Sequence, residues 1–94
     1  MHFVYILRSQ KDSGWYIGYS TDVERRLAEH HSGKNVSTRL RRPFQLIYYE
    51  AYIHKMDALG REKFLKSGAG RRFLEKQMRY YLAEAGENPS APPL

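Results

Sequence analysis

Two tyrosines, an arginine and a histidine follow one another in the first third of the chain, in an order that suits phosphodiester chemistry. Tyr5 and Tyr16 lie in Val-Tyr-Ile and Tyr-Ile-Gly segments, both typical of strands. Arg26 and His30 are four residues apart, so on a helix they share one face. A guanidinium binds phosphate oxygens through a fork of donors, while phenols and an imidazole hold or accept protons. The set predicts one half of a nuclease-like site.

Each of these residues alone also has an ordinary structural interpretation. Tyr5 and Tyr16 can form a cross-strand aromatic pair in the core. Arg26 can be a solvated helix arginine, and His30 can be a helix-packing histidine. Only the combination favours chemistry over packing.

A carboxylate that the first half lacks appears later, at Glu62. It lies three residues from both Leu59 and Leu65, so it shares their apolar helix stripe. A carboxylate on a core-facing side must be paired or must bind a cation. Pairing with an arginine, or a side chain that reaches out to solvent, are the alternatives to a metal site.

The first half of the chain predicts a hairpin, a helix and a third strand. β-branched and aromatic residues predict strands over residues 3–7 and 15–19, with a turn over 10–14. Thr21-Asp22-Val23-Glu24 predicts a capping box that opens a helix ending at Ser32-Gly33. A polar and basic loop, which we expect to be mobile, spans residues 34–42 and precedes a strand over residues 44–52.

The second half predicts two helices. Asp57 is expected to cap a helix that runs to about Ser67, and Gly68-Ala69-Gly70 is expected to break it. A third helix is expected over residues 71–83. The resulting order, ββαβαα, predicts an α+β fold with a small three-stranded antiparallel sheet and three helices packed on it. Residues 1–83 are expected to form one domain, and the proline-rich residues 84–94 a disordered tail.

The composition favours a polyanionic partner. Sixteen Lys and Arg against ten Asp and Glu give a net charge of +6. A basic protein binds nucleic acid through counterion release, although small basic proteins without that role are common. The chain has no cysteine, which excludes disulfides and thiolate zinc sites. No apolar stretch approaches the roughly 20 residues of a membrane span, so we expect a cytoplasmic protein with no membrane association.

The ordered set of motifs resembles the GIY-YIG nuclease superfamily. The resemblance covers residues 3 to about 80 and is carried by Val-Tyr-Ile, Tyr-Ile-Gly, the arginine eight residues after Gly18, His30, and Glu62 in a later helix. The length and the sequence Leu65-Lys66-Ser67 with Gly70-Arg71 are similar to short stand-alone bacterial members. Those members resemble the catalytic domain of structure-specific junction endonucleases.

The resemblance implies a role for each residue. Tyr5 and Tyr16 match the tyrosines of the two motifs, Arg26 the phosphate-holding arginine, and His30 the position four residues later. Glu62 matches the single metal-binding acid, for Mg²⁺ or Mn²⁺. Tyr16 would take a proton from the attacking water, and Tyr5 and His30 would position Tyr16 and that water. An unperturbed tyrosine has a pKa near ~10, so Arg26, the metal and the basic field must favour phenolate for this role.

Two positions depart from the family pattern. Phe3 and Val4 stand where the first motif has glycine and isoleucine, and the tyrosine that follows is kept. Tyr19 stands where many repair-type members have a lysine, which removes one cation near the phosphate. The second departure favours the alternative that the chain is a weakly active or inactive nucleic-acid-binding module.

Two basic zones are expected to bind the nucleic-acid backbone without reading sequence. The loop over residues 34–42 carries four cations and no acid, and residues 61–79 carry seven cations and two acids. The backbone N–H of Gly18 is expected to approach the phosphate. The residues predicted to contact nucleic acid are Gly18, Tyr19, Lys34, Arg39, Arg41, Arg42, Lys66, Arg71 and Arg72.

The prediction with most support is a metal-dependent endonuclease that acts on DNA, by structure rather than by sequence, in repair or recombination. The binding module without cleavage is the first alternative. A protein-interaction domain whose basic face meets an acidic partner is the second. A chain this small offers little surface for specificity, so a protein partner or a homodimer is also plausible.

Overall fold

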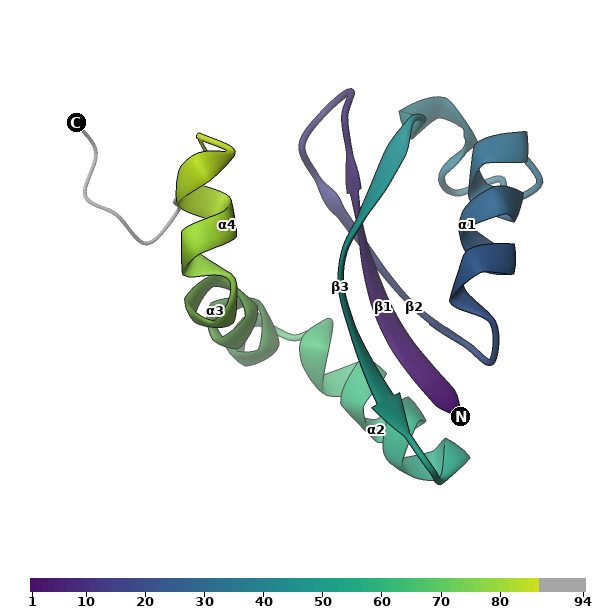
Figure 1. The fold of residues 1–94 in the computed structure, drawn as a ribbon, viewed down its shortest axis with the longest axis vertical. Helices are drawn as coiled ribbons and strands as arrows, with labels where there is room; N and C mark the ends of the chain where they lie inside the picture. Colours follow the sequence, from purple (N-terminus) through teal and green to yellow (C-terminus); the bar gives the residue numbers. More distant parts are fainter. Residues whose placement is uncertain (87–94) are drawn as a thin grey trace. The chain divides into compact units, whose positions relative to one another are not determined.

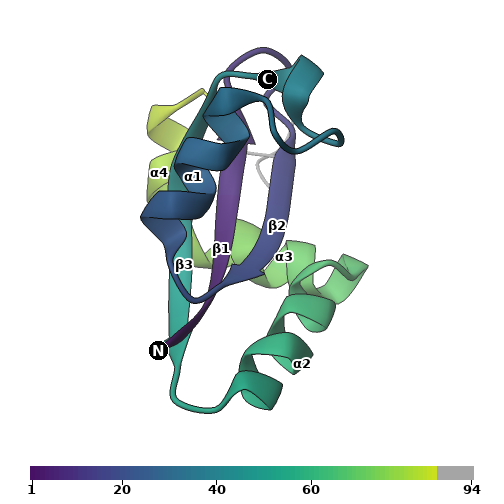
Figure 2. The same ribbon diagram turned by 90° about the vertical axis from the view of Figure 1, so that its right-hand side faces the viewer.

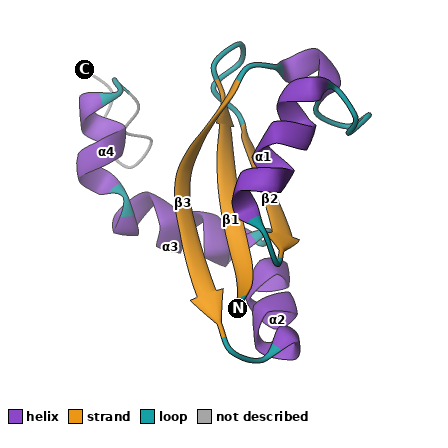
Figure 3. Ribbon diagram, turned by 45° about the vertical axis from the view of Figure 1, so that its right-hand side comes forward, coloured by secondary structure: helices purple, strands orange, loops and turns teal. Residues whose placement is uncertain are grey.

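A three-stranded antiparallel sheet organises residues 1–62, one of the two compact units in this computed structural model, which describes residues 1–86. The strands are β1 (His2–Ser9), β2 (Trp15–Ser20) and β3 (Phe44–Tyr52), in the order β2-β1-β3 (Figures 1 and 3). In the middle strand β1, Val4, Tyr5, Ile6 and Leu7 are all fully buried, so both faces of this strand are covered.

The register of the sheet sorts the tyrosines onto two faces. Tyr5 lies opposite Gly18 of β2 and Tyr49 of β3, while Leu7 lies opposite Tyr16. Tyr5 and Tyr16 are therefore diagonal neighbours on one face, not a directly opposed pair. Alternation places the side chains of Val4 and its partner Glu50 on the other face.

Helix α1 (Val23–Ser32) packs on the face that carries Tyr5 (Figure 2). Val23 and Leu27 lie against the core formed by Tyr5, Leu7 and Phe44. The expected capping box is wrong in its cap residue. Asp22, not Thr21, is the N-cap, and its carboxylate accepts from the Arg25 N–H at 3.0 Å. The helix ends at Gly33 as predicted.

The loop over residues 34–42 is held to the sheet, unlike the mobile loop that its composition suggests. It contains a short 3-10 helix, η1 (Arg39–Arg41). The hydroxyl of fully buried Ser9 donates to the Arg41 carbonyl at 2.6 Å, and the Gln10 N–H donates to the Pro43 carbonyl at 2.8 Å. These bonds fix the loop beside the end of β1.

Helix α2 (Lys55–Leu65) follows β3 and begins before the expected position. Asp57 lies within its first turn and is not its cap. The His54 ring accepts from the Met56 N–H at 3.0 Å, so the histidine satisfies a donor at this helix end. Ala58 is fully buried, while Glu62 and Leu59 are half-buried, which places all three on the inner side of the helix.

The second compact unit starts at Lys63 and contains α3 (Gly68–Gln77) and α4 (Arg79–Glu84). Gly68-Ala69-Gly70, which were expected to break the preceding helix, form the first turn of α3. Ser67 caps this helix, and its hydroxyl accepts from the Gly70 N–H at 3.1 Å. A Cβ at Gly70 would collide with the Phe64 carbonyl, so this glycine permits a close approach. The expected third helix is divided at Met78 into α3 and α4.

The α+β class and the three-stranded antiparallel sheet are confirmed, with four α-helices where three were predicted. One domain over residues 1–83 stays a prediction. Glu84 ends α4, and the greater part of the predicted tail, residues 87–94, lies outside the described residues. Within residues 1–86, no helix combines the length and apolar character needed to cross a membrane.

Candidate active site

Tyr5 is the centre of a buried polar cluster between the sheet and α1. Its side chain is fully buried, and its ring passes over Gly18 of the neighbouring strand. A Cβ at Gly18 would lie 2.5 Å from the Tyr5 hydroxyl, so only glycine leaves room for the phenol. The structure therefore explains the glycine at position 18 by the space that Tyr5 needs, whereas the sequence predicted that the Gly18 N–H approaches a phosphate.

The His30 ring is hydrogen-bonded to two hydroxyls, those of Tyr5 and Thr38. The His30 Nε2 atom lies 3.1 Å from the Tyr5 hydroxyl, and Nδ1 lies 2.7 Å from the Thr38 hydroxyl. Because the Thr38 hydroxyl donates to the Asn35 carbonyl at 3.4 Å, it accepts from His30 Nδ1–H. His30 Nε2 is then the acceptor for the Tyr5 O–H. Both His30 and Thr38 are buried.

Thr38 and Asn35 were missed from sequence, since a threonine and an asparagine in a basic loop carry no visible signal. Their contacts explain why the loop is ordered next to the tyrosines. The Asn35 amide donates to the Tyr16 hydroxyl at 3.5 Å, a long contact, and the Tyr16 ring meets the His30 ring edge-on at 4.8 Å. Tyr16 is half-buried, so unlike Tyr5 it keeps part of its surface accessible to a substrate.

Arg26 brings a positive charge to the same cluster. Its guanidinium lies beside the Tyr5 hydroxyl and donates from Nη1 to Glu29 at 3.1 Å. Its Nε atom is buried and has no acceptor among the described residues. A buried N–H without a partner costs about 1–3 kcal/mol, so packing alone does not account for this donor. Arg25 points away and is 63% exposed.

The environment keeps Tyr5 and His30 uncharged at neutral pH. Burial raises the pKa of Tyr5, and the nearby Tyr16 and Glu62 charges raise it further, against the opposing effect of Arg26. Burial lowers the pKa of His30, and the charge of Arg26 lowers it further. A neutral phenol that donates to a neutral imidazole is a fixed structural contact. Tyr5 is therefore a poor proton acceptor.

The charge of Glu62, on α2, contributes to raising the pKa of the Tyr5 hydroxyl. No three Asp, Glu or His side chains within residues 1–86 come together as a preformed metal site. A single half-buried carboxylate fits Mg²⁺ or Mn²⁺ bound jointly with waters and substrate phosphate oxygens, which is how Mg²⁺ is commonly held. The donor set fits a metal that arrives with the substrate.

Some residues of the first unit that were predicted to contact nucleic acid form hydrogen bonds within the protein, and others have exposed side chains. Arg41 makes a two-pronged ion pair with Asp12 at 2.9 and 3.3 Å, and Arg42 donates to the carbonyls of Arg39 and His31. Lys34 and the Arg39 side chain are exposed. The loop cations thus serve partly to hold the loop itself.

Although Tyr19 stands where many relatives have a lysine, a cation still lies near it. The Lys55 ammonium lies 5.9 Å from the centre of the Tyr19 ring, and the Tyr19 hydroxyl is 2.7 Å from His2 Nδ1. In the second unit, the predicted contacts Lys66, Arg71 and Arg72 are all exposed. Binding by these residues stays a prediction.

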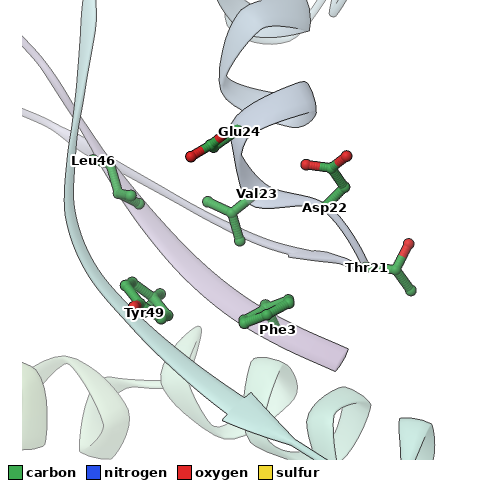
Figure 4. Close-up of a pocket in the computed structure, with 7 residues that line it drawn as sticks. All are labelled: Phe3, Thr21, Asp22, Val23, Glu24, Leu46 and Tyr49. Atoms are coloured by element: carbon green, nitrogen blue, oxygen red, sulfur yellow. The ribbon is translucent and has the colours of Figure 1, made fainter. Parts of the chain in front are cut away.

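A separate hollow of about 330 Å³ lies at the start of α1 (Figure 4). It has an apolar floor and two acids at its rim, and none of the five predicted catalytic residues lines it. Its lining consists of Phe3, Thr21, Asp22, Val23, Glu24, Leu46 and Tyr49. Acids would repel a phosphate, so the hollow is not an extension of a nucleic-acid site.

This fold and this cluster define a GIY-YIG catalytic domain. Residues 1–77 match the GIY-YIG catalytic domain family, and the chain belongs to that family. GIY-YIG domains form a superfamily of nucleases that generally depend on divalent metal ions.

The relatives are short proteins of the UPF0213 group. A UPF0213 protein of Haloquadratum walsbyi is 38% identical over 92 residues, which are 97% of this chain and 96% of that protein. UPF0213 protein YazA of Bacillus subtilis is 32% identical over 91 residues, 96% of this chain and 86% of that one. The solution NMR structure of a UPF0213 protein from Bacillus halodurans is 40% identical, covers 81% of this chain and 83% of its own, and has a TM-score of 0.51.

Proposed function

We propose that this chain is a metal-dependent endonuclease that hydrolyses phosphodiester bonds of DNA, in repair or recombination. The observation that carries the proposal is the convergence of Tyr5, Tyr16, His30 and Arg26 in one cluster, in which the charge of Glu62 also helps to raise the pKa of Tyr5. The rings of Tyr5 and Tyr16 lie 6.3 Å apart. Packing alone does not call for a buried guanidinium N–H without an acceptor.

In the proposed reaction, Arg26 holds the phosphoryl oxygens and donates from Nε to one of them. The water oxygen bonds to phosphorus as the bond from phosphorus to one ester oxygen breaks. Tyr16, as the phenolate, takes the proton of the water and becomes the neutral phenol, and the leaving oxygen receives a proton from solvent. Glu62 would hold the metal ion, which would stabilise negative charge on the phosphate and the leaving oxygen.

Tyr5 and His30 position the reacting groups and do not transfer protons in this scheme. The His30 ring supports Tyr16 from its edge, and Thr38 fixes the tautomer of His30. Because the Tyr5 hydroxyl donates to His30, its oxygen faces Arg26 and orients the guanidinium. The site is thus organised before any substrate arrives.

The test is cleavage of plasmid, branched and single-stranded DNA with Mg²⁺ or Mn²⁺ by the full chain and by Glu62→Gln. We expect Glu62→Gln to lose at least about a hundredfold in rate, because removing one electrostatic contact in a site costs about that much. Glu24→Gln, at an exposed acid of α1, is the matched control and should keep the wild-type rate. A Glu62→Gln protein as active as the wild type would contradict the site assignment.

Tyr19 in place of lysine favours a second candidate, a nucleic-acid-binding module without cleavage. That candidate predicts salt-dependent binding of DNA by the wild type with no product under either metal. Lys55 above the Tyr19 ring argues against it, because it returns a cation to this position.

A further inference from the structure

A second polar cluster lies on the face of the sheet opposite Tyr5, and it joins β3 to α2. Its centre is the carboxylate of Glu50. Oε1 accepts from Arg61 Nε at 2.8 Å and from the Tyr52 hydroxyl at 2.6 Å. Oε2 accepts from Arg61 Nη2 at 3.1 Å and from the Tyr48 hydroxyl at 2.6 Å. We call these four residues the Glu50 clamp.

The clamp is not an ordinary surface ion pair. The side chains of Glu50 and Arg61 are 16% and 28% exposed, and the pairing is two-pronged, which fixes the guanidinium plane as well as its distance. Two phenols occupy further lone pairs of the carboxylate. Burial, together with these hydrogen bonds, raises the pKa of Tyr48 and of Tyr52 to about 12, so both phenols remain donors. Four directional bonds define one arrangement of Arg61.

Arg61 directly precedes Glu62, so the position of one constrains the other. On a helix, neighbouring side chains point about 100° apart and their Cα atoms differ by about 1.5 Å in height. Ala58, fully buried and one turn before Arg61, lets the helix approach closely on this same side. The clamp therefore sets both the rotation and the height of α2 at the point where Glu62 projects.

We propose that Glu50 and Arg61 are positioning residues that aim the Glu62 carboxylate at the tyrosine cluster. The clamp lies on the face of the sheet opposite Tyr5 and holds α2 through Arg61, the residue next to Glu62. This inference rests on the proposed function, since Glu62 is there the metal-binding acid. A displacement of about 1 Å at a reacting group can cost a factor of about 10² in rate, so a loosened helix would reduce catalysis without touching the substrate.

The first test compares Arg61→Gln, Arg61→Lys and Glu50→Gln with the wild type in cleavage assays over a range of Mg²⁺ concentrations. We expect kcat to fall about 10- to 100-fold for Arg61→Gln and Glu50→Gln, and the Mg²⁺ requirement to rise, as for other residues that orient metal ligands. The KM for DNA should stay within about twofold. Arg61→Lys, which keeps the charge but not the two-pronged fork, should lie between them and the wild type.

Asp12→Asn is the matched control, because Asp12 and Arg41 form an equally two-pronged pair away from α2. It should keep the wild-type kcat and Mg²⁺ requirement. Circular dichroism checks that each variant is folded. If Arg61→Gln fails to fold, the Tyr48→Phe, Tyr52→Phe double variant replaces it, since it keeps the ion pair and removes two of the four bonds. Folded clamp variants with wild-type kcat and Mg²⁺ requirement would overturn the inference.

A second measurement does not depend on cleavage. Mn²⁺ broadens NMR signals near its binding site, so the wild type should show broadening at Glu62 and the Tyr5 ring that Glu62→Gln abolishes. Arg61→Gln should need at least about threefold more Mn²⁺ for the same effect. If no DNA is cleaved by the wild type, the proposed function fails while this measurement still decides the inference. Equal broadening in Arg61→Gln and wild type, or none in the wild type, overturns it.

Discussion

The two faces of the sheet carry polar clusters built from similar residues but completed to different degrees. On the outer face, the one opposite Tyr5, each oxygen of Glu50 accepts two hydrogen bonds, and the Arg61 guanidinium pairs with it through two nitrogens. On the inner face, the one that carries Tyr5 and packs against α1, the guanidinium of Arg26 keeps a buried Nε without an acceptor in the described part of the chain. A completed network fixes structure, whereas an incomplete one keeps capacity for a ligand.

The difference also appears in the tyrosines. Both Tyr48 and Tyr52 donate to a carboxylate, which locks them as neutral phenols. Tyr5 is locked in the same way by His30, but Tyr16 is only half-buried and receives a long contact from Asn35. The inner cluster thus holds three residues firmly around a fourth that stays available. We regard that asymmetry as the signature of the site.

The largest expected effect comes from the unpaired donor of the inner cluster. Arg26→Lys keeps the charge and removes the guanidinium fork, so we expect the cleavage rate to fall about 10²- to 10³-fold. Arg25→Lys, one residue away and exposed, should stay within about twofold of the wild type. Initial rates on one DNA substrate at saturating Mg²⁺ measure both. Equal losses in the two variants would show that the effect is not specific to the position of Arg26.

Next comes the glycine beneath Tyr5. Gly18→Ala forces a methyl group against the phenol, so we expect a loss of about 1–3 kcal/mol in the free energy of unfolding, together with reduced cleavage. Gly60→Ala, at an open helix position with nothing within 4 Å, should instead gain about 0.5–1 kcal/mol. Urea unfolding of both proteins tests the contrast. Stabilisation by both changes would mean that Tyr5 does not occupy this space.

A similar or smaller loss is expected from Thr38→Val, which removes the acceptor of His30 Nδ1 and leaves a buried N–H unpaired. The free energy of unfolding should fall by about 1–3 kcal/mol. Thr21→Val, at an exposed position, should change it by less than about 0.5 kcal/mol. The imidazole ¹⁵N shifts should also report a changed tautomer population in Thr38→Val. Unchanged shifts would contradict the assigned hydrogen-bond direction.

The smallest expected effect is a pH dependence of stability. The pKa of His30 is lowered in the folded chain, so the unfolded chain binds a proton first as the pH falls. The contribution of His30 is complete above its ordinary pKa of about 6.5 and is lost as the pH falls through the lower folded value. The slope cannot exceed about 1.4 kcal/mol per pH unit. His30→Gln should flatten this part of the curve, and an identical slope in the variant would exclude His30 as its source.

Much of the fold could be predicted because local chemistry specifies it. The β-branched and aromatic runs placed the three strands, β3 to the residue, and Gly33 ended α1 where expected. The errors fall where neighbours compete. Thr21 and Asp22 both suit a cap, and only the path of the chain after β2 selects Asp22. Gly68 and Gly70 have low helix propensity, yet the close packing of Gly70 against the preceding turn and the Ser67 cap place both in α3.

The candidate site was predictable as a set of residues but not as a geometry. Tyr5, Tyr16, Arg26 and His30 do meet, yet sequence could not show that Tyr5 hydrogen-bonds to His30 whereas Tyr16 meets it through a ring contact. Thr38 and Asn35 gave no signal, because their importance comes from where the loop is held. The roles of these residues in a reaction stay predictions.

The sequence alone determined which groups are present, how they alternate along strands, and which helix face they share, because those follow from the periods of the backbone. The tertiary structure decided which hydrogen bonds are complete. Whether a guanidinium nitrogen finds an acceptor, as the Nε of Arg61 does and the buried Nε of Arg26 does not within residues 1–86, depends on residues distant in the chain. A pairing of that kind is fixed only when the sheet and helices bring its partners within about 3 Å.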